Sequence, residues 1–151
     1  GSQMNLDELR EEIAADEGVI LETYLCSLSH KTVGIGHLCL EGEAEYDLPL
    51  GTAVSQSRVN GLFEMDIYQT IGDCRSIYKN FDERPEELQR ILANMCFQLG
   101  KTRLLKFLRT NALINIGDYQ SASIEMLDSR WAEQTPERAQ RLSKRMAAIA
   151  V

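Results

Sequence analysis

Glu17, Cys26 and Thr32 bring a carboxyl group, a thiol and a hydroxyl group into one short part of the sequence. Glu17 directly precedes Gly18, which is expected to end a helix over residues 6–16. The partial negative charge at the end of a helix disfavours another negative charge, so a glutamate there tends to keep its proton. That property suits a general acid. A surface glutamate beside a helix cap is the alternative interpretation.

Glycines alternate with apolar residues after Thr32, which predicts an unusual strand. Successive side chains of a strand point to opposite faces, so Thr32, Gly34 and Gly36 are expected on one face. This face would be nearly bare and open to a bulky ligand, with a hydroxyl group beside it. A bend or bulge in the strand explains the glycines equally well. His37 belongs to the other face, where we expect a structural salt bridge with Asp66 on a later helix.

Hydrophobic periodicity and turn residues predict the elements that must hold these groups. A small sheet of short strands is expected within residues 19–40, with turns near 27–31, followed by a loop over 41–51. Ser55 is expected to cap a long helix to about residue 79. Further helices are predicted from Pro85 to Gly100 and over residues 103–114, 117–127 and 136–148. The fold class is therefore α+β and mainly α.

The length and composition suit a single domain. The chain has 151 residues, of which 44% are hydrophobic, and this is enough for a sizeable core. We interpret residues 1–3 as the remnant of a cleaved tag and residues 4–151 as the domain. No run without charged residues exceeds 10 residues, so neither a membrane span nor a secretory hydrophobic segment is expected.

Charge is distributed unevenly along the chain, whose net charge is −7. Residues 1–75 contain 14 acidic and 4 basic side chains, whereas residues 76–151 contain 9 and 12. The second half would attract an anionic partner, although a solvated helical surface explains the same charges equally well. The acidic total argues against nucleic acid as a partner.

The cysteines do not indicate a metal site. Cys26, Cys39, Cys74 and Cys96 have no paired CxxC spacing, and only two histidines accompany them. Zinc sites normally need four such ligands, so no metal is expected. In a chain without a secretory segment, free thiols are the default, and Cys96 suits the core as a small apolar residue.

The spacing of the chemical groups matches a known family. Eight residues separate Glu17 from Cys26, and five separate Cys26 from Thr32. The further matching blocks are Gly34-Ile35-Gly36-His37, Asn94-Met95-Cys96-Phe97-Gln98-Leu99-Gly100, Ser129-Arg130-Trp131, and Gln134-Thr135-Pro136 with Arg138. With these blocks the sequence resembles the phage-type lysozymes from about residue 5 to residue 145. Only the loop over residues 41–54 departs from the pattern.

This resemblance implies a two-lobed fold, with lobes at about residues 14–60 and 80–151 joined by the long helix over 55–79. The helix over residues 6–16 is expected to pack on the C-terminal lobe. In the cleft between the lobes, the family cuts the β-1,4 bond of peptidoglycan between N-acetylmuramic acid and N-acetylglucosamine. No cofactor is expected, and the chain is expected to be a monomer.

The family's functional residues carry over position by position. Glu17 matches the general acid, Thr32 the threonine that helps to hold the attacking water, and Arg138 the arginine that pairs with the acid. A cation there would lower the pKa of Glu17 and so oppose the effect of the helix end. Positions that contact sugar are Leu38, Phe97 and Thr110, of which Thr110 replaces another hydroxyl residue. Glu125 stands where the family can have a sugar-binding amide, so that role is not transferred.

Cys26 departs from the commonest pattern, because many members have aspartate at this position and only a subset has cysteine. A thiolate can activate water, but an ordinary thiol titrates near pH ~8.5 and is only a few per cent ionised at neutral pH. Either a neighbouring positive charge lowers that pKa, or Cys26 mainly orients the water while Thr32 shares the task. Direct attack by sulfur is a further, less favoured route.

Two other interpretations stay open. The chain could be a wall-binding module that kept the fold and lost hydrolysis, in which case Cys26 marks decay. Redox control is the other, with Cys26 masked in a disulfide with another of the four thiols. For the leading interpretation, the resemblance implies synthesis in the host cytoplasm and release to the cell wall through a membrane lesion made by a separate protein.

Overall fold

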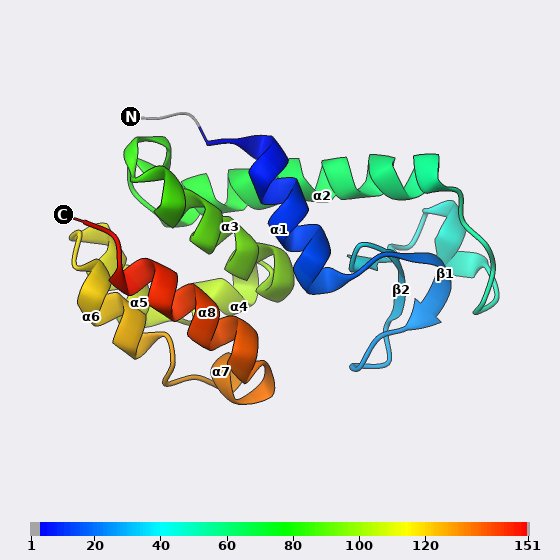
Figure 1. The fold of residues 1–151 in the computed structure, drawn as a ribbon. Helices are drawn as coiled ribbons and strands as arrows, with labels where there is room; N and C mark the ends of the chain where they lie inside the picture. The colour runs from blue at the N-terminus through cyan, green and yellow to red at the C-terminus, as the bar shows by residue number, and fades with distance from the viewer. Residues whose placement is uncertain (1–3, 151) are drawn as a thin grey trace. The chain divides into compact units, whose positions relative to one another are not determined.

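The computed structural model describes residues 4–150, so the predicted tag remnant at residues 1–3 lies outside the described residues. The chain is mainly helical and has one three-stranded antiparallel sheet (Figure 1), which confirms the predicted α+β class. The elements are α1 (Leu6–Glu17), β1 (Ile20–Leu25), β2 (Lys31–Gly34), β3 (His37–Leu38), α2 (Gln56–Ile77), α3 (Glu86–Leu99), α4 (Lys101–Leu105), α5 (Leu108–Asn115), α6 (Tyr119–Glu125), α7 (Arg130–Gln134) and α8 (Pro136–Ala147), with short 3-10 helices η1 (Ala44–Asp47) and η2 (Phe81–Glu83).

Two compact units divide the chain. The first unit, hereafter the sheet unit, is Arg10–Gln69. The second, hereafter the helical unit, consists of the residues up to Leu9 together with those from Thr70 onward. Both α1 and α2 contribute residues to each unit. The predicted lobes at about 14–60 and 80–151, and the predicted packing of the first helix, stay predictions.

Side-chain caps fix the starts of the helices that flank the sheet. The Asn5 Oδ1 atom accepts a hydrogen bond of 3.2 Å from the amide of Glu8 at the start of α1. At the start of α2, Ser55 Oγ accepts one of 3.1 Å from the amide of Arg58. Both caps satisfy helix-end amides that lack a backbone partner, and both confirm predicted helix starts. At the other end of α1, the chain leaves the helix through Gly18, whose φ is 76°.

The register of the sheet places three residues in one row. β2 pairs with β1 on one side and with β3 on the other, in antiparallel directions. Tyr24 lies opposite Thr32, and Thr32 lies opposite Leu38. Residues that lie directly opposite each other point to the same face, so these three side chains share one face of the sheet.

The expected strand with a bare glycine face is wrong. β2 ends at Gly34 and β3 begins at His37, so the chain reverses between them. Gly34 has a φ of 68° and Gly36 a φ of 64°, in the left-handed region that glycine tolerates because it has no Cβ atom. The glycines therefore make a tight hairpin rather than an open strand surface.

The core of the helical unit forms around α3, most of whose residues are buried. Its buried residues are Leu88, Gln89, Ile91, Leu92, Ala93, Asn94, Met95, Cys96 and Leu99. Gly100 ends the helix with a φ of 80°, which confirms the predicted terminator. No helix within residues 4–150 is long and apolar enough to cross a membrane.

Two predicted segments differ from the structure, one in each unit. The single helix expected over residues 103–114 is two helices, α4 and α5. The amides of Lys106 and Phe107 bond to carbonyl groups three residues earlier, which tightens the chain and ends α4. The Phe107 ring then meets Trp131 edge-on, with ring centroids 6.1 Å apart. The loop expected over residues 41–51 also contains the short helix η1.

Candidate active site

The Glu17 carboxyl group lies against the hairpin that joins β2 and β3. A Cβ atom added to Gly36 would lie 2.6 Å from Glu17 Oε1, closer than any real contact of this kind. The absence of a side chain at position 36 therefore makes the space that this carboxyl group occupies. The positive φ of Gly36 favours glycine, and a Cβ atom at this position would force the end of the Glu17 side chain to move. The hairpin thus brings the last residue of α1 next to the sheet.

The Cys26 thiol is partly exposed in the turn that follows β1. The amide of Cys26 donates a hydrogen bond of 3.0 Å to the His30 carbonyl oxygen, which closes this turn. Burial alone would raise the pKa of the thiol, but hydrogen bonds from the backbone at His30 and Leu28 and from the Thr32 side chain outweigh it. The net effect lowers the pKa of Cys26 below its ordinary value. Hydrogen bonding to the charged form, without a neighbouring cation, thus favours the thiolate.

Thr32 is the buried partner of this sulfur. Only 2% of the residue is exposed, and its hydroxyl group donates a hydrogen bond of 2.9 Å to the His30 carbonyl oxygen. The same hydroxyl also reaches Cys26, so its single proton has two acceptors within range. When Cys26 is ionised, the hydroxyl can turn to the sulfur. Thr32 and Cys26 therefore act as one hydrogen-bonded pair.

Tyr24 belongs to the same site, although sequence reasoning gave it no role. Burial raises the pKa of its phenol, and the negative charges of Glu17, Cys26 and Cys39 raise it further. The phenol therefore lies within electrostatic range of both the carboxyl group and the thiol. Its place in the sequence could have revealed it, because residues two apart in a strand share a face and Tyr24 precedes Cys26 by two.

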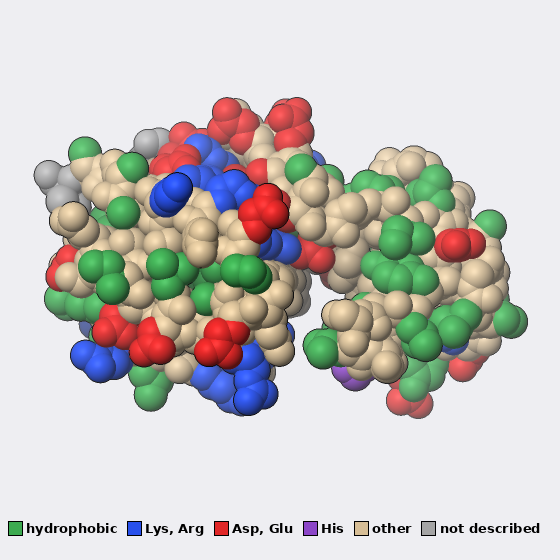
Figure 2. Space-filling view, turned by 60° about the horizontal axis from the view of Figure 1, so that its bottom comes forward, with side chains coloured by type: hydrophobic (Ala, Val, Ile, Leu, Met, Phe, Trp, Pro, Cys, Tyr) green, Lys and Arg blue, Asp and Glu red, His purple; other side chains and the backbone are tan. Residues whose placement is uncertain are grey.

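Leu38 completes the row of Tyr24 and Thr32 and is 50% exposed. It is one of many exposed apolar side chains of the sheet unit, and such side chains gather on the face of this unit that Figure 2 shows. The others between residues 19 and 40 are Val19, Ile20, Leu21, Leu25, Leu28 and Leu40. Exposed apolar surface of this extent is typical of an interaction site. A ligand-contacting role for Leu38 stays a prediction.

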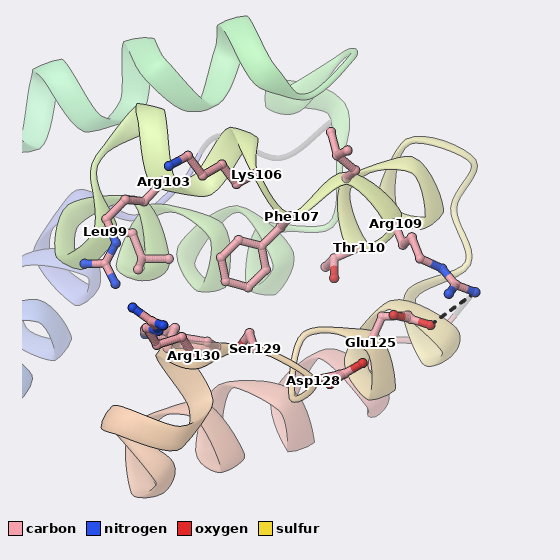
Figure 3. Close-up of a pocket in the computed structure, with 12 residues that line it drawn as sticks. Leu99, Arg103, Lys106, Phe107, Arg109, Thr110, Glu125, Asp128, Ser129 and Arg130 are labelled. Atoms are coloured by element: carbon pink, nitrogen blue, oxygen red, sulfur yellow. Dashed lines mark ion pairs between the residues drawn. The ribbon is translucent and has the colours of Figure 1, made fainter.

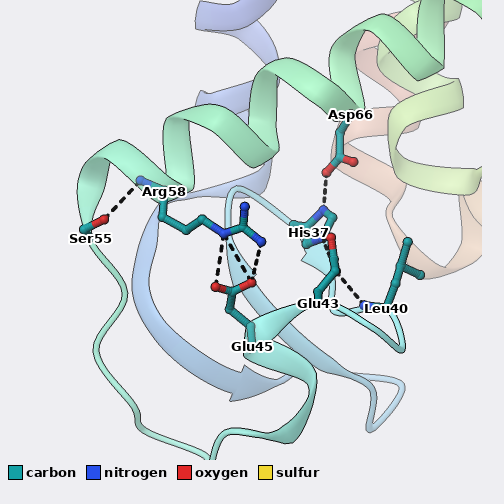
Figure 4. A network of polar contacts seen from close by, with 7 residues as sticks. All are labelled: His37, Leu40, Glu43, Glu45, Ser55, Arg58 and Asp66. Atoms are coloured by element: carbon teal, nitrogen blue, oxygen red, sulfur yellow. Dashed lines mark hydrogen bonds and ion pairs between the residues drawn. The ribbon is translucent and has the colours of Figure 1, made fainter.

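His37 points away from this row and holds the sheet to α2, which confirms the predicted salt bridge. Its Nδ1 atom lies 2.6 Å from Asp66 Oδ2, and its Nε2 atom lies 2.9 Å from Glu43 Oε1 (Figure 4). Burial opposes protonation of the ring, but these two carboxylates outweigh it and raise the pKa of His37 to about 8. Glu43 was not foreseen as the second partner. A separate ion pair, Arg58 with Glu45 at 2.8 Å, fixes η1 to the start of α2.

The helical unit contains a pocket of about 530 Å³ in which Thr110 lies (Figure 3). The lining comes from residues between Leu99 and Trp131. Its basic side chains are Arg103, Lys106, Arg109 and Arg130, and its acidic side chains are Glu125 and Asp128. Arg109 pairs with Glu125 at 3.6 Å on one side of the pocket, whereas Arg103 and Arg130 lie together on the other side. A pocket of this size and charge can accept a small anionic group.

The remaining predicted residues of the helical unit have structural contacts. Arg138 is 9% exposed, and its Nε atom donates a hydrogen bond of 2.9 Å to Asn94 Oδ1. Trp131 is 2% exposed and donates through Nε1 to Gln98 Oε1 at 2.7 Å, so it lies in the core. Phe97 is half-buried in α3. The roles of Phe97 and Thr110 in binding sugar, and of Arg138 in pairing with the acid, stay predictions.

The geometry argues against a masked thiol. Cys39 follows β3, and β2 lies between it and Cys26, so two strand spacings of about 4.8 Å separate their backbones. A disulfide needs Cα atoms within about 7 Å of each other. Cys74 and Cys96 are buried at 0% and 2% exposure. Among the described residues, no group of three potential ligands is arranged to hold a metal ion.

Comparison with known proteins gives consistent matches over most of the chain. The profile described as phage lysozyme matches residues 14–148. A probable T4-type lysozyme 2 of Dictyostelium discoideum is 31% identical over 91% of this chain and 92% of its own. The pre-baseplate central spike protein Gp5 of Enterobacteria phage T4 is 27% identical over 89% of this chain and 27% of its own. The peptidoglycan hydrolase gp36 of Pseudomonas phage phiKMV is 28% identical over 91% of this chain and 15% of its own.

Proposed function

The chain belongs to the phage lysozyme family and is a glycoside hydrolase, and from this premise we propose how it acts. It hydrolyses the β-1,4 bond of peptidoglycan between N-acetylmuramic acid and N-acetylglucosamine. Glu17 is the general acid, and Cys26 together with Thr32 activates the attacking water. The observation that carries this proposal is that the Glu17 carboxyl group lies against the hairpin after β2, the strand whose Thr32 is hydrogen-bonded to Cys26.

The two groups divide the reaction as an inverting glycosidase requires. One must protonate the leaving oxygen, and the other must take a proton from water on the opposite face of the sugar ring. The Glu17 carboxyl group donates the first proton. The Cys26 thiolate accepts the second. Its hydrogen bonds lower the pKa of the thiol and so raise the fraction of Cys26 that is ionised and able to accept a proton. Direct attack by sulfur would require the sulfur to stand where the water belongs.

The basic pocket around Thr110 supports peptidoglycan as the substrate. Peptide stems of peptidoglycan end in carboxylates, and guanidinium groups such as those of Arg103 and Arg130 bind carboxylates well. The relative from phage phiKMV also bears the name peptidoglycan hydrolase. The predicted sugar contacts of Leu38 and Phe97 belong to the same proposal. Glu125, paired with Arg109, contributes no amide, so its role differs from that of a sugar-binding amide.

Release of reducing ends from purified peptidoglycan tests this proposal. Glu17→Gln should be folded and inactive, and Cys26→Ala should lose on the order of 100-fold or more, because each variant lacks one proton-transfer group. Cys26→Asp should retain or exceed the wild-type rate. Cys39→Ala, which removes another partly exposed thiol of the same sheet, is the matched control and should stay within about twofold. Equal rates for wild type and Cys26→Ala would refute the role of the thiol.

A turbidity assay separates this enzyme from a wall-binding module. Clearing of permeabilised bacteria supports hydrolysis, whereas sedimentation of the protein with the walls, without clearing, supports binding alone. We also propose that the protein acts on the wall after leaving the host cytoplasm through a lesion made by another protein, and that it acts as a monomer.

A further inference from the structure

Tyr24 is the one member of the active-site row without a part in the proposed reaction. It lies opposite Thr32 in the sheet, and Leu38 lies on the other side of Thr32. Cys26 follows Tyr24 by two residues and closes the turn onto His30, so its side chain is on the same face. Tyr24 thus stands beside both groups that are proposed to handle water.

The phenol oxygen of Tyr24 is available to a ligand. None of residues 4–150 is hydrogen-bonded to this hydroxyl group, and the residue is only partly buried. A phenol has one proton to donate and lone pairs that accept. Burial and the charges of Glu17, Cys26 and Cys39 raise the pKa of Tyr24, so the group stays neutral while the site works. It can therefore hold a water molecule without exchanging a proton with it.

Thr32 by itself gives the site little surface with which to hold water. It is 2% exposed, and its only proton is directed to the His30 carbonyl oxygen or to Cys26. The attacking water has two O–H groups, and the thiolate takes the proton of one. The other needs an acceptor that the water can reach. In this row, the partly exposed residue beside Cys26 that offers an oxygen acceptor is Tyr24.

We propose that Tyr24 is a further catalytic residue, whose phenol oxygen accepts a hydrogen bond from the attacking water and so orients it. The inference rests on the proposed function. Water oxygen forms the new bond to the anomeric carbon, and one of its protons passes to the Cys26 sulfur. The bond from that carbon to the leaving oxygen breaks, and Glu17 protonates the leaving oxygen. Tyr24 gains and loses no proton in these steps.

The test compares Tyr24→Phe with wild type on soluble glycan fragments that carry their peptide stems. Tyr24→Phe removes one oxygen atom and keeps the ring, so the fold should persist, as circular dichroism and Tm can check. One lost hydrogen bond to the reacting water should lower kcat about 10-fold and leave KM within about twofold. Tyr46→Phe is the matched control, because that tyrosine is 43% exposed in η1 of the same unit. It should change neither constant.

A double variant tests whether Tyr24 and Cys26 act on the same water. If they do, Tyr24→Phe should cost much less in the Cys26→Ala background than in wild type, because groups that act together are not additive. An unchanged kcat for Tyr24→Phe, a rise in KM alone, or full additivity would overturn the inference while the proposed function stands. A wild type that releases no reducing ends would instead refute the proposed function itself.

Discussion

At the residue scale, the environment of Cys26 favours the ionised thiol that the proposed mechanism requires. An aspartate would be ionised at neutral pH without help, whereas an ordinary thiol would not. Here the help comes from the backbone of the turn at residues 26–30 and from Thr32. The cysteine therefore depends on its hydrogen-bond donors more strongly than an aspartate would. This dependence makes Thr32 important even though it is almost fully buried.

Thr32→Val tests that dependence. Valine has the shape of threonine but no hydroxyl group, so it removes one of the hydrogen bonds that lower the pKa of Cys26. The pKa of the thiol should rise, and the rising limb of the pH profile of kcat/KM should move to higher pH. The pH profile of the rate at which iodoacetamide alkylates Cys26, followed by peptide mass spectrometry, should also move to higher pH. Profiles that coincide with those of the wild type would show that the hydroxyl does not support the thiolate.

At the element scale, the hairpin between β2 and β3 lies against Glu17, the proposed general acid. Gly36→Ala would push a Cβ atom to 2.6 Å from the Glu17 carboxyl group and would strain a φ of 64°. Gly51→Ala is the matched control, because Gly51 has a φ of 83° but open space around it. Both variants should lose about 1–2 kcal/mol of stability, as expected for a side chain at positive φ.

Only Gly36→Ala should also lose activity, on the order of 100-fold, because it displaces a group at the reaction centre. Initial rates of reducing-end release, measured well below the Tm of both variants, distinguish the two effects. If the two alanine variants have the same activity, the hairpin does not position Glu17.

The contact of β3 with α2 predicts a pH-dependent stability. His37 has a folded pKa of about 8, against 6.5 for an ordinary histidine, because Asp66 and Glu43 stabilise the charged ring. A raised folded pKa stabilises the fold fully below the unfolded pKa, and this stabilisation is lost as pH rises through the folded pKa. This stabilisation, about 2 kcal/mol of the unfolding free energy, should therefore be lost between about pH 6.5 and pH 8.

Urea unfolding of wild type and His37→Gln measures this contribution. The difference in unfolding free energy between the two proteins should shrink by about 2 kcal/mol from about pH 6 to about pH 9. Subtracting the variant removes the contributions of groups that both proteins share. A difference that is constant with pH would mean that the ring gains no proton affinity on folding.

These elements also show what sequence alone could and could not predict. Helix starts at Asn5 and Ser55 and the end at Gly100 were predictable, because caps and terminators act within a few residues. The hairpin at Gly34 and Gly36 was not, since alternating glycines suit both an extended strand and a reversal. The backbone conformation of such a glycine depends on which distant residue packs beside it, and beside Gly36 this is Glu17.

At the scale of the whole molecule, the candidate site residues are distributed over both compact units. Glu17, Cys26, Thr32 and Leu38 belong to the sheet unit, whereas Phe97, Thr110 and Arg138 belong to the helical unit. The identities of these residues came from the family pattern. Tyr24 was missed because that pattern assigns it nothing, although strand alternation places it beside Cys26.

The uneven charge of the chain parallels the distribution of the candidate residues over the two units. The sheet unit lies within the acidic half of the sequence, whereas the basic side chains around the pocket lie within the second half. An anionic polymer would be attracted to the second half while the acid and the thiol act in the first.

The anomeric configuration of the first product tests the central claim most directly, namely that Cys26 activates water while Glu17 protonates the leaving oxygen. Proton nuclear magnetic resonance of fresh digests of purified peptidoglycan should show the new N-acetylmuramic acid end first as the α anomer, because water attacks opposite the β bond that breaks. Initial formation of the β anomer would instead indicate a covalent intermediate on sulfur. It would contradict the role of Cys26 as the base.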